Sequence, residues 1–246
     1  MTVLLKAELL KLRTTRGVYW YLAALVLLTG IAAAAQASDT TVFQRDDPGF
    51  QRDLVSQSVT APLLALLIGI VSITVEWRHG TITRTLLITP RRWRVLAAKE
   101  LHASAVGVAL AAIGVVVSLA VAIPILSNDD VSFTLDAALL GRIAEIAIAS
   151  ALWGALGVGL GALVQNQTGA VVGAVIFVTL AESLLAALLD WADLHWLTDV
   201  LPRHALDALA GHEAGLSPGA GGAVGLAYVV VFASVAWLRI RRQDVT

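Results

Sequence analysis

Residues 142–190 form one long, mostly apolar block, and this block constrains the fold more than any other feature of the chain. As a single helix rising about 1.5 Å per residue, it would extend roughly 73 Å, whereas the hydrocarbon core of a bilayer is about 30 Å thick. The block must therefore fold back on itself. The polar cluster Gln165-Asn166-Gln167-Thr168 near its middle is the one plausible turn, so we predict two helices, over 142–164 and 169–190.

Other segments of the chain are also apolar and long enough to cross a bilayer. With 58% hydrophobic and 14% charged residues, the chain has too little polar surface to cover a soluble domain. We therefore predict an all-α integral membrane bundle, a single transmembrane domain over 1–246 that passes six times through a cell membrane, expected to be a bacterial plasma membrane. The remaining four spans are expected at 17–37, 58–76, 103–126 and 221–238.

The first span follows a basic stretch, residues 1–16, and ends near Ala35-Gln36-Ala37, which resembles a signal-peptide cleavage site. Its apolar run is about 20 residues long, whereas a signal-peptide core usually has about 7–15. We therefore predict an uncleaved anchor, with a cleaved signal peptide as the alternative. Leucines at helical spacing predict that 1–16 is an amphipathic segment on the cytoplasmic membrane surface; the alternative is a plain extension of the first span.

Lysine and arginine indicate the orientation, because short cytoplasmic loops carry an excess of both. If the N-terminus is cytoplasmic, 13 of the 17 basic residues lie inside. An even number of spans then places both termini in the cytoplasm, the connecting segment 77–102 inside and the loop 191–220 outside. The inside residues are Lys6, Lys11, Arg13, Arg16, Arg78, Arg84, Arg91, Arg92, Arg94, Lys99, Arg239, Arg241 and Arg242.

The segment 77–102 is the longest inner connection and is strongly basic. Gly80 is a poor residue for a helix interior and Pro90 forbids a helix through its position, so we predict a short helix, Thr81–Ile88, between two breaks. On composition alone, an ordinary positive-inside loop is an equally good interpretation, with Trp77 and Trp93 as anchors at the membrane interface.

At this segment the chain resembles the permease subunits of ABC-2 type ATP-binding-cassette exporters. In that family the second membrane helix ends in an acidic residue and an arginine. Gly-Thr, a short helix and a proline with basic neighbours follow, and a lysine then opens the third helix. The residues that the resemblance assigns to an ATPase-coupling loop are Glu76, Arg78, Gly80, Thr81, Arg84, Pro90, Arg91, Arg92 and Lys99.

The resemblance implies that this chain forms the translocation path for export of an unidentified substrate, while a separate ATPase subunit hydrolyses ATP. It also implies a second permease subunit, identical or different. Glu76, Arg78 and Arg84 are expected to orient the short helix on the ATPase through ion pairs. The chain has no Gly-x-x-x-x-Gly-Lys-[Ser/Thr] phosphate-binding sequence, so we predict no enzyme activity and no cofactor of its own. Membrane lipid is an expected partner and nucleic acid is not.

Two other classes of function stay open at this point. A stand-alone channel or secondary carrier would need polar groups near mid-membrane, and Glu182 is the main candidate for a pathway or proton-coupling residue. Packing of Glu182 against a buried polar group of another helix is equally plausible. Glu145 is expected to pair with Arg142 at i,i+3. An intramembrane enzyme would need an acid, base or metal constellation, and the spans contain none.

Glycines in the fourth and fifth spans form two Gly-x-x-x-Gly pairs, Gly157 with Gly161 and Gly169 with Gly173. Small residues let helices approach closely in lipid, so we predict packing faces. Packing within one chain is favoured because the two helices form a hairpin, and packing across a dimer is the alternative. In the outer loop we expect short amphipathic helices and no metal site, because no two of its histidines have i,i+4 spacing.

Overall fold

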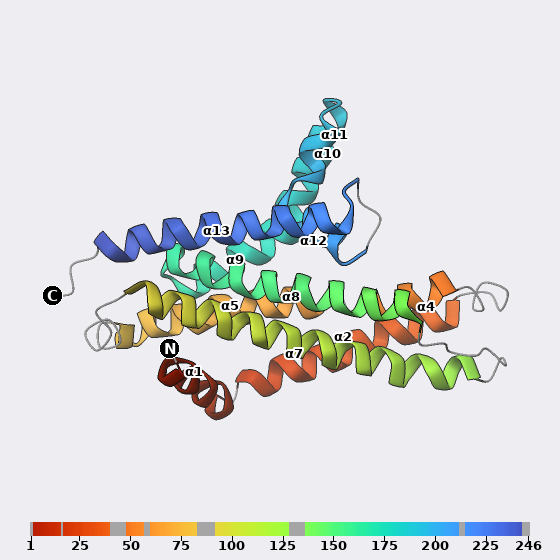
Figure 1. The fold of residues 1–246 in the computed structure, drawn as a ribbon, viewed down its shortest axis with the longest axis horizontal. Coiled ribbons are helices and arrows are strands. Elements are labelled where there is room, and N and C mark those ends of the chain that lie inside the picture. Colours follow the sequence, from red (N-terminus) through yellow and green to blue (C-terminus); the bar gives the residue numbers. More distant parts are fainter. Residues whose placement is uncertain are drawn as a thin grey trace.

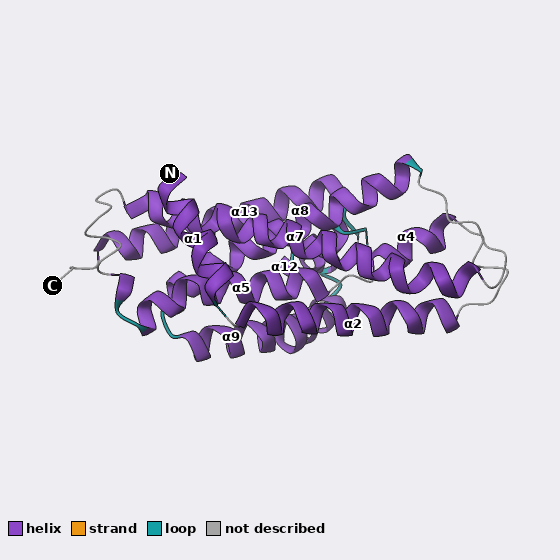
Figure 2. Ribbon diagram, turned by 90° about the horizontal axis from the view of Figure 1, so that it is seen from below, coloured by secondary structure: helices purple, strands orange, loops and turns teal. Residues whose placement is uncertain are grey.

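A computed structural model of the chain describes residues 2–15, 17–39, 48–56, 60–82, 92–127, 136–211 and 215–242. These residues form helices joined by short turns, and they contain no strand (Figure 2). The predicted all-α fold is confirmed. Of the predicted loop residues, Arg84, Pro90 and Arg91 lie outside the described part of the chain, as does most of the expected helix Thr81–Ile88.

Six helices are long and apolar enough to cross a membrane, which confirms the predicted number of spans. Figure 1 shows both chain ends at the same end of an elongated bundle. The spans are α2 (Gly17–Asp39), α5 (Thr60–Arg78), α7 (Arg92–Ser127), α8 (Ala137–Val164), the run of α9 (Gln167–Ile176), η1 (Phe177–Ala181) and α10 (Glu182–Trp191), and α13 (Pro218–Arg242).

Helix α7 begins at Arg92, well before residue 103, where hydropathy places the start of the span. Hydropathy detects only the part of a helix that suits lipid, and this helix continues beyond that part. The segment between the second and third spans is therefore shorter than the predicted 77–102. Four shorter helices complete the described chain: α1 (Thr2–Thr14), α4 (Pro48–Ser56), α11 (His195–Asp199) and α12 (Pro202–Leu209).

The predicted turn between the fourth and fifth spans is present. Gln165 adopts a left-handed backbone conformation with φ of 58°, which ends α8. Asn166 then caps α9, because its side-chain oxygen accepts a hydrogen bond from the amide of Gly169 at 2.8 Å. The polar cluster in the apolar block thus supplies both a helix stop and a helix start.

Helix α8 is the centre of the bundle and packs against α5, α7 and α13. Its glycines make the contact with α5 possible. A Cβ atom at Gly157 would overlap the carbonyl oxygen of Leu66, and one at Gly161 would lie 2.9 Å from the carbonyl oxygen of Ile70. Close backbone approach of this kind is how membrane helices gain packing contacts when lipid removes the hydrophobic drive between them.

The first glycine pair packs within the chain, against α5, and the second glycine pair behaves differently. Gly157 and Gly161 contact α5 and not the hairpin partner α9. At Gly173 no described atom lies within 4 Å of where a Cβ would be, and at Gly169 the near neighbour is the capping residue Asn166. Glycine spacing marks a smooth face on a helix, but it does not say which helix covers that face.

The fifth span bends away from the bundle. Its middle is the π-helical turn η1, after which α10 and α11 project outward from the other helices (Figure 1). Large apolar side chains of α10 are exposed, among them Leu184, Leu188 and Trp191. The chain returns through α12, which packs on α13 and confirms the expectation of short helices in this segment.

Candidate functional site

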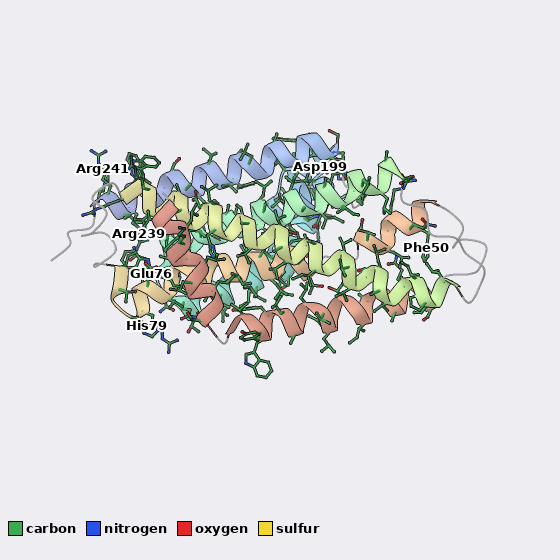
Figure 3. The ribbon with its side chains drawn as sticks, turned by 60° about the horizontal axis from the view of Figure 1, so that its bottom comes forward. Phe50, Glu76, His79, Asp199, Arg239 and Arg241 are labelled. Atoms are coloured by element: carbon green, nitrogen blue, oxygen red, sulfur yellow. The ribbon has the colours of Figure 1, made fainter. Side chains whose placement is uncertain are left out.

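The predicted coupling segment lies at the end of the bundle that carries both chain termini. Figure 3 shows Glu76, His79, Arg239 and Arg241 gathered at this end, away from Phe50 at the other. Helix α5 ends here and α7 begins here, so the residues on either side of the segment are held by two spans. Helix α1 lies beside them and contacts α7.

Four charged side chains from these three helices meet in one cluster, which we call the charge cluster: Glu8 and Lys11 of α1, Glu76 of α5 and Lys99 of α7. The Lys99 ammonium lies 2.7 Å from Glu76 Oε1 and 3.1 Å from Glu8 Oε1. Lys11 lies 2.6 Å from Glu76 Oε1 and 2.8 Å from Glu8 Oε1. The two carboxylates and two ammonium groups balance in formal charge.

Lys99 is the deepest member of the charge cluster, with a side chain only 1% exposed. Its ammonium has three N–H donors. They find three acceptors: Glu8, Glu76 and the backbone carbonyl oxygen of Ser72 at 3.0 Å. A buried charge is tolerated when it is paired and its hydrogen bonds are satisfied, and Lys99 meets both conditions.

The pKa values of the α1 residues reflect this pairing. Burial by itself would raise the pKa of Glu8, but the positive charges of Lys99 and Lys11 outweigh it and hold the pKa below its usual value. Burial would likewise lower the pKa of Lys11, yet its hydrogen bonds to Glu76 and Glu8 raise that pKa above the usual value. Both groups are therefore charged over the neutral pH range.

The structure brings together only part of the predicted loop set. Glu76 and Lys99, far apart in sequence, are direct partners inside the chain. Arg78 is exposed and points to Gln167, with 3.4 Å between Nη1 and Oε1. Gly80 has a positive φ of 64°, a conformation that glycine adopts freely, and it follows the end of α5. Thr81 lies next in a described helical turn.

The resemblance implied that Glu76 helps to orient the short helix on an ATPase. In the structure its side chain is buried inside the chain. It is 4% exposed and its Oε1 already binds two lysines. Sequence reasoning missed Glu8 and Lys11, which complete the charge cluster. The available signal was their i,i+3 spacing on α1, but nothing in that spacing indicated burial against α5 and α7.

Other basic residues at this end bind the exposed carbonyl groups of helix C-termini. Arg92 donates to the carbonyl oxygen of Ile240 in the last turn of α13 at 2.6 Å. Arg239 donates to the carbonyl oxygen of Leu163 at the end of α8, also at 2.6 Å. Cations at helix C-termini satisfy free carbonyls and oppose the helix dipole. These arginines therefore stabilise the bundle end as well as marking its orientation.

Glu182, the predicted pathway candidate, is fully buried and lies where α10 meets the start of α12. Its Oε1 accepts hydrogen bonds from the backbone amide of Arg203 at 2.6 Å and from that of His204 at 3.3 Å. A carboxylate at a helix N-terminus is favourable because amides and dipole both attract it. Glu182 thus binds a polar group of another helix, as one of its two sequence interpretations held. The pairing of Glu145 with Arg142 is confirmed at 3.1 Å.

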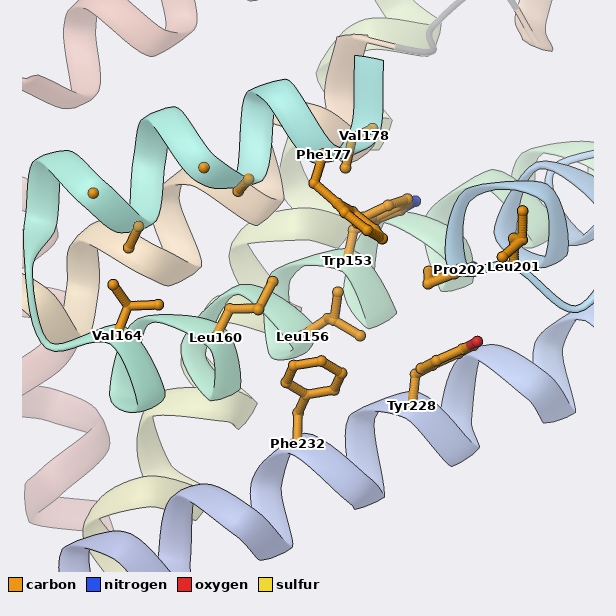
Figure 4. Close-up of a pocket in the computed structure, with 14 residues that line it drawn as sticks. Trp153, Leu156, Leu160, Val164, Phe177, Val178, Leu201, Pro202, Tyr228 and Phe232 are labelled. Carbon is orange, nitrogen blue, oxygen red and sulfur yellow. The ribbon is translucent and has the colours of Figure 1, made fainter. Parts of the chain in front are cut away.

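A cavity of about 420 Å³ lies between α8, α9 and α13, near Leu201 and Pro202 (Figure 4). Aliphatic and aromatic side chains form its walls together with two glycines, and Phe232 and Tyr228 face it from α13. The Tyr228 hydroxyl donates to the carbonyl oxygen of Val200 at 3.0 Å. Among the described residues, those that line this cavity are apolar apart from the hydroxyl of Tyr228 and the indole N–H of Trp153, so it suits an apolar group.

Comparison with known proteins gives one family match. A family model described as ABC-2 family transporter protein matches residues 4–185, which is more than half of the chain. The matched region includes the charge cluster, the first four spans and the fifth span up to residue 185. No curated protein matches the chain.

Proposed function

Because the chain belongs to the ABC-2 family of transporter proteins, we propose that it is the permease subunit of an ATP-driven exporter. In this proposal it forms the translocation path with a second permease subunit, identical or different, and a separate ATPase subunit binds and hydrolyses ATP. The substrate leaves the cell through the path between the two permeases. The chain itself performs no catalysis.

The observation that carries the proposal is the set of ion pairs that joins the helices on either side of residues 79–91. The helices on both sides of this segment, α5 and α7, are joined by the buried pair Glu76 and Lys99, and both are joined to α1 through Glu8 and Lys11. A force applied to the segment would move the three helices together. This is the mechanical property that a loop pushed by an ATPase requires.

The apolar cavity between α8, α9 and α13 weighs against the alternative, a stand-alone channel or secondary carrier. Such a protein needs polar ligands for an ion or a proton-coupling group at membrane depth. Glu182, the candidate for that role, is engaged by the amides of α12.

Co-purification tests the proposal. The full chain is extracted from native membranes in mild detergent, and the sample is examined for an ATPase subunit and for nucleotide hydrolysis. We expect an ATPase to accompany the chain and to be lost when residues 81–88 are scrambled. A chain that purifies alone and supports flux without nucleotide would contradict the exporter and favour the carrier.

A single substitution locates the contact more finely. Arg84→Glu reverses a charge in the predicted coupling helix and is expected to lower transport-coupled ATPase activity without affecting membrane insertion. Lys6→Glu, on the exposed face of α1 and outside the predicted coupling helix, is the matched control. Unchanged coupling in Arg84→Glu would remove this residue from the proposed contact.

A further inference from the structure

An open groove runs along the last turns of α13, at the end of the bundle that holds the charge cluster. It has a volume of about 490 Å³ and is lined by Val235, Leu238, Arg239 and Arg242. These positions are spaced i, i+3, i+4 and i+7, so they lie on one face of the helix. We call this surface the α13 groove. Its volume falls within the range of about 300–1,000 Å³ that is typical of ligand sites.

The α13 groove is apolar in one half and cationic in the other. Val235 and Leu238 are exposed, and so is Val231, which lies one turn earlier on the same face. Arg239 and Arg242 follow in the last turn of the helix, and both are exposed as well. The order of chemistry along the groove, apolar and then positively charged, matches that of a phospholipid, in which an acyl chain leads to a phosphate.

Trp237 indicates the depth of the α13 groove in the membrane. Its side chain is partly exposed, and the Arg241 guanidinium lies 5.6 Å from its ring centroid. Figure 3 shows Arg239 and Arg241 at this end of the molecule. Tryptophan concentrates at the level of lipid head groups. The arginines that follow Trp237 therefore lie at the level of lipid phosphates, and the apolar half of the groove lies at the level of acyl chains.

The arginines of the α13 groove can still donate to a ligand. Arg239 gives one N–H to the carbonyl oxygen of Leu163 at 2.6 Å, and an arginine has five N–H donors. Arg92 of α7 donates to the carbonyl oxygen of Ile240, so a cation from another helix already meets the negative end of the α13 dipole. Among the described residues, none that lines the groove is a carboxylate. The lining thus carries two positive charges from its arginines.

We propose that the α13 groove binds a phospholipid whose head group has a net negative charge. The phosphate accepts hydrogen bonds from Arg239 and Arg242, because the planar guanidinium group matches the geometry of phosphate oxygens. One acyl chain lies along Leu238, Val235 and Val231. This inference concerns a lipid site at one end of a helix and does not depend on the proposed transport function.

Charge and length together distinguish the proposed ligand from related molecules. Phosphatidylcholine and phosphatidylethanolamine carry an ammonium group close to the phosphate, and the two arginines repel that group. Phosphatidylglycerol has the phosphate without the cation. Inorganic phosphate has the negative charge but no chain to cover the apolar half of the α13 groove. A preference for phosphatidylglycerol that persists in the presence of phosphate is therefore the expected behaviour.

Native mass spectrometry tests the proposal. The full chain is purified from nanodiscs that contain equal parts of the three lipids with identical acyl chains, and the lipids that stay bound are counted. We expect phosphatidylglycerol to be retained about tenfold over each of the other two, the effect of two basic residues at a membrane surface. Equal retention of the three lipids would overturn the proposal. Loss of phosphatidylglycerol to excess inorganic phosphate, compared with chloride at the same ionic strength, would show a phosphate site and overturn it too.

Arg242→Gln and Arg241→Gln separate a lipid site from general attraction to a basic surface. The two residues are adjacent and each substitution removes one positive charge, but of the two only Arg242 lines the α13 groove. We expect Arg242→Gln to reduce the preference to about threefold and Arg241→Gln to keep it in full. An equal loss in both variants would show that the basic end attracts anionic lipid without a site, and would overturn the proposal.

Both substitutions are at exposed positions, and both keep the bonds from Arg92 and Arg239 to the helix carbonyls. Monodisperse elution and an unchanged helical circular dichroism spectrum establish that each variant is folded. The lipid counts for the unmodified chain test the preference for a negative head group independently of either variant.

Discussion

The end of the α5–α7–α8 bundle that holds the charge cluster and the projecting α9–α10 region contain similar sequence features but use them differently. Each has a buried glutamate and a Gly-x-x-x-Gly pair. In the first region Glu76 is neutralised by lysines from other helices, and Gly157 contacts α5. In the second, Glu182 accepts hydrogen bonds from backbone amides of nearby α12, and no described atom lies within 4 Å of where a Cβ at Gly173 would be.

Glu76 thus stabilises contacts between helices that are distant in the sequence, whereas Glu182 stabilises a contact between elements that are close in the sequence. Glu76 joins three helices that are far apart in the sequence, so its partners cannot change without moving the bundle. Glu182 joins two elements about twenty residues apart, at the base of an arm that projects from the bundle (Figure 1). The bundle end with the charge cluster is therefore suited to transmit force, whereas the α9–α10 region can move with smaller consequences for the rest of the chain.

Lys99→Met is expected to have the largest effect. It leaves Glu8 and Glu76 with only the half-exposed Lys11, and removing one partner of a buried ion pair costs roughly 3–5 kcal/mol. Thermal unfolding in detergent measures the loss, with Lys6→Met on the exposed face of α1 as the control. Adding Glu76→Gln to Lys99→Met is expected to recover part of the stability. A variant as stable as the unmodified chain would show that the charge cluster does not hold the three helices together.

Gly157→Ala and Gly173→Ala compare the two glycine pairs directly. The added methyl at Gly157 meets the Leu66 carbonyl oxygen, so we expect a loss of about 1–3 kcal/mol. At Gly173 the methyl meets no described atom, and the better helix propensity of alanine should be neutral or stabilising by up to about 1 kcal/mol. The free energy of unfolding of each variant is measured from unfolding curves in the same detergent. Equal losses would mean that α9 has a partner in solution.

Glu182→Gln tests the local role of the buried carboxylate. Replacing the carboxyl group at the α12 N-terminus by an amide weakens the acceptor for the Arg203 and His204 amides and is expected to cost about 1–2 kcal/mol. Hydrogen exchange should show faster exchange in α12 and unchanged protection in α5 and α8. Transport should persist. A transport-dead variant with unchanged exchange would instead support the proton-coupling interpretation of this residue.

The pH dependence of the charge cluster is expected to be the smallest effect. The pKa of Glu8 is lowered from 4.5, so its contribution to stability is present above that pH and is lost as the pH falls through the lowered value. The pKa of Lys11 is raised from 10.5, so its contribution is present below that pH and is lost as the pH rises through the raised value.

The protection of α1 should therefore be constant between about pH 5 and pH 10. Hydrogen exchange of α1, corrected for the intrinsic pH dependence of amide exchange, measures it. Glu8→Gln should remove the loss of protection on the acid side. A change in α1 protection between pH 6 and pH 8 would show that a group other than Glu8 and Lys11 controls the stability of α1.

The sequence by itself determined the number of spans and the hairpin turn at Gln165-Asn166. These follow from hydropathy, length and local helix capping, which are properties of neighbouring residues. The family resemblance likewise depended on a local motif, Glu76 to Lys99, and the family match is consistent with it. The i,i+3 pair of Arg142 and Glu145 was predicted for the same reason.

Only the tertiary structure decided which distant residues meet. It placed Glu8 and Lys11 with Glu76 and Lys99, and Gly157 against α5 in preference to the hairpin partner. The physical reason is that partner choice in lipid depends on shape and on pairing of buried charge. Both are properties of two surfaces together, and one helix sequence specifies only its own surface.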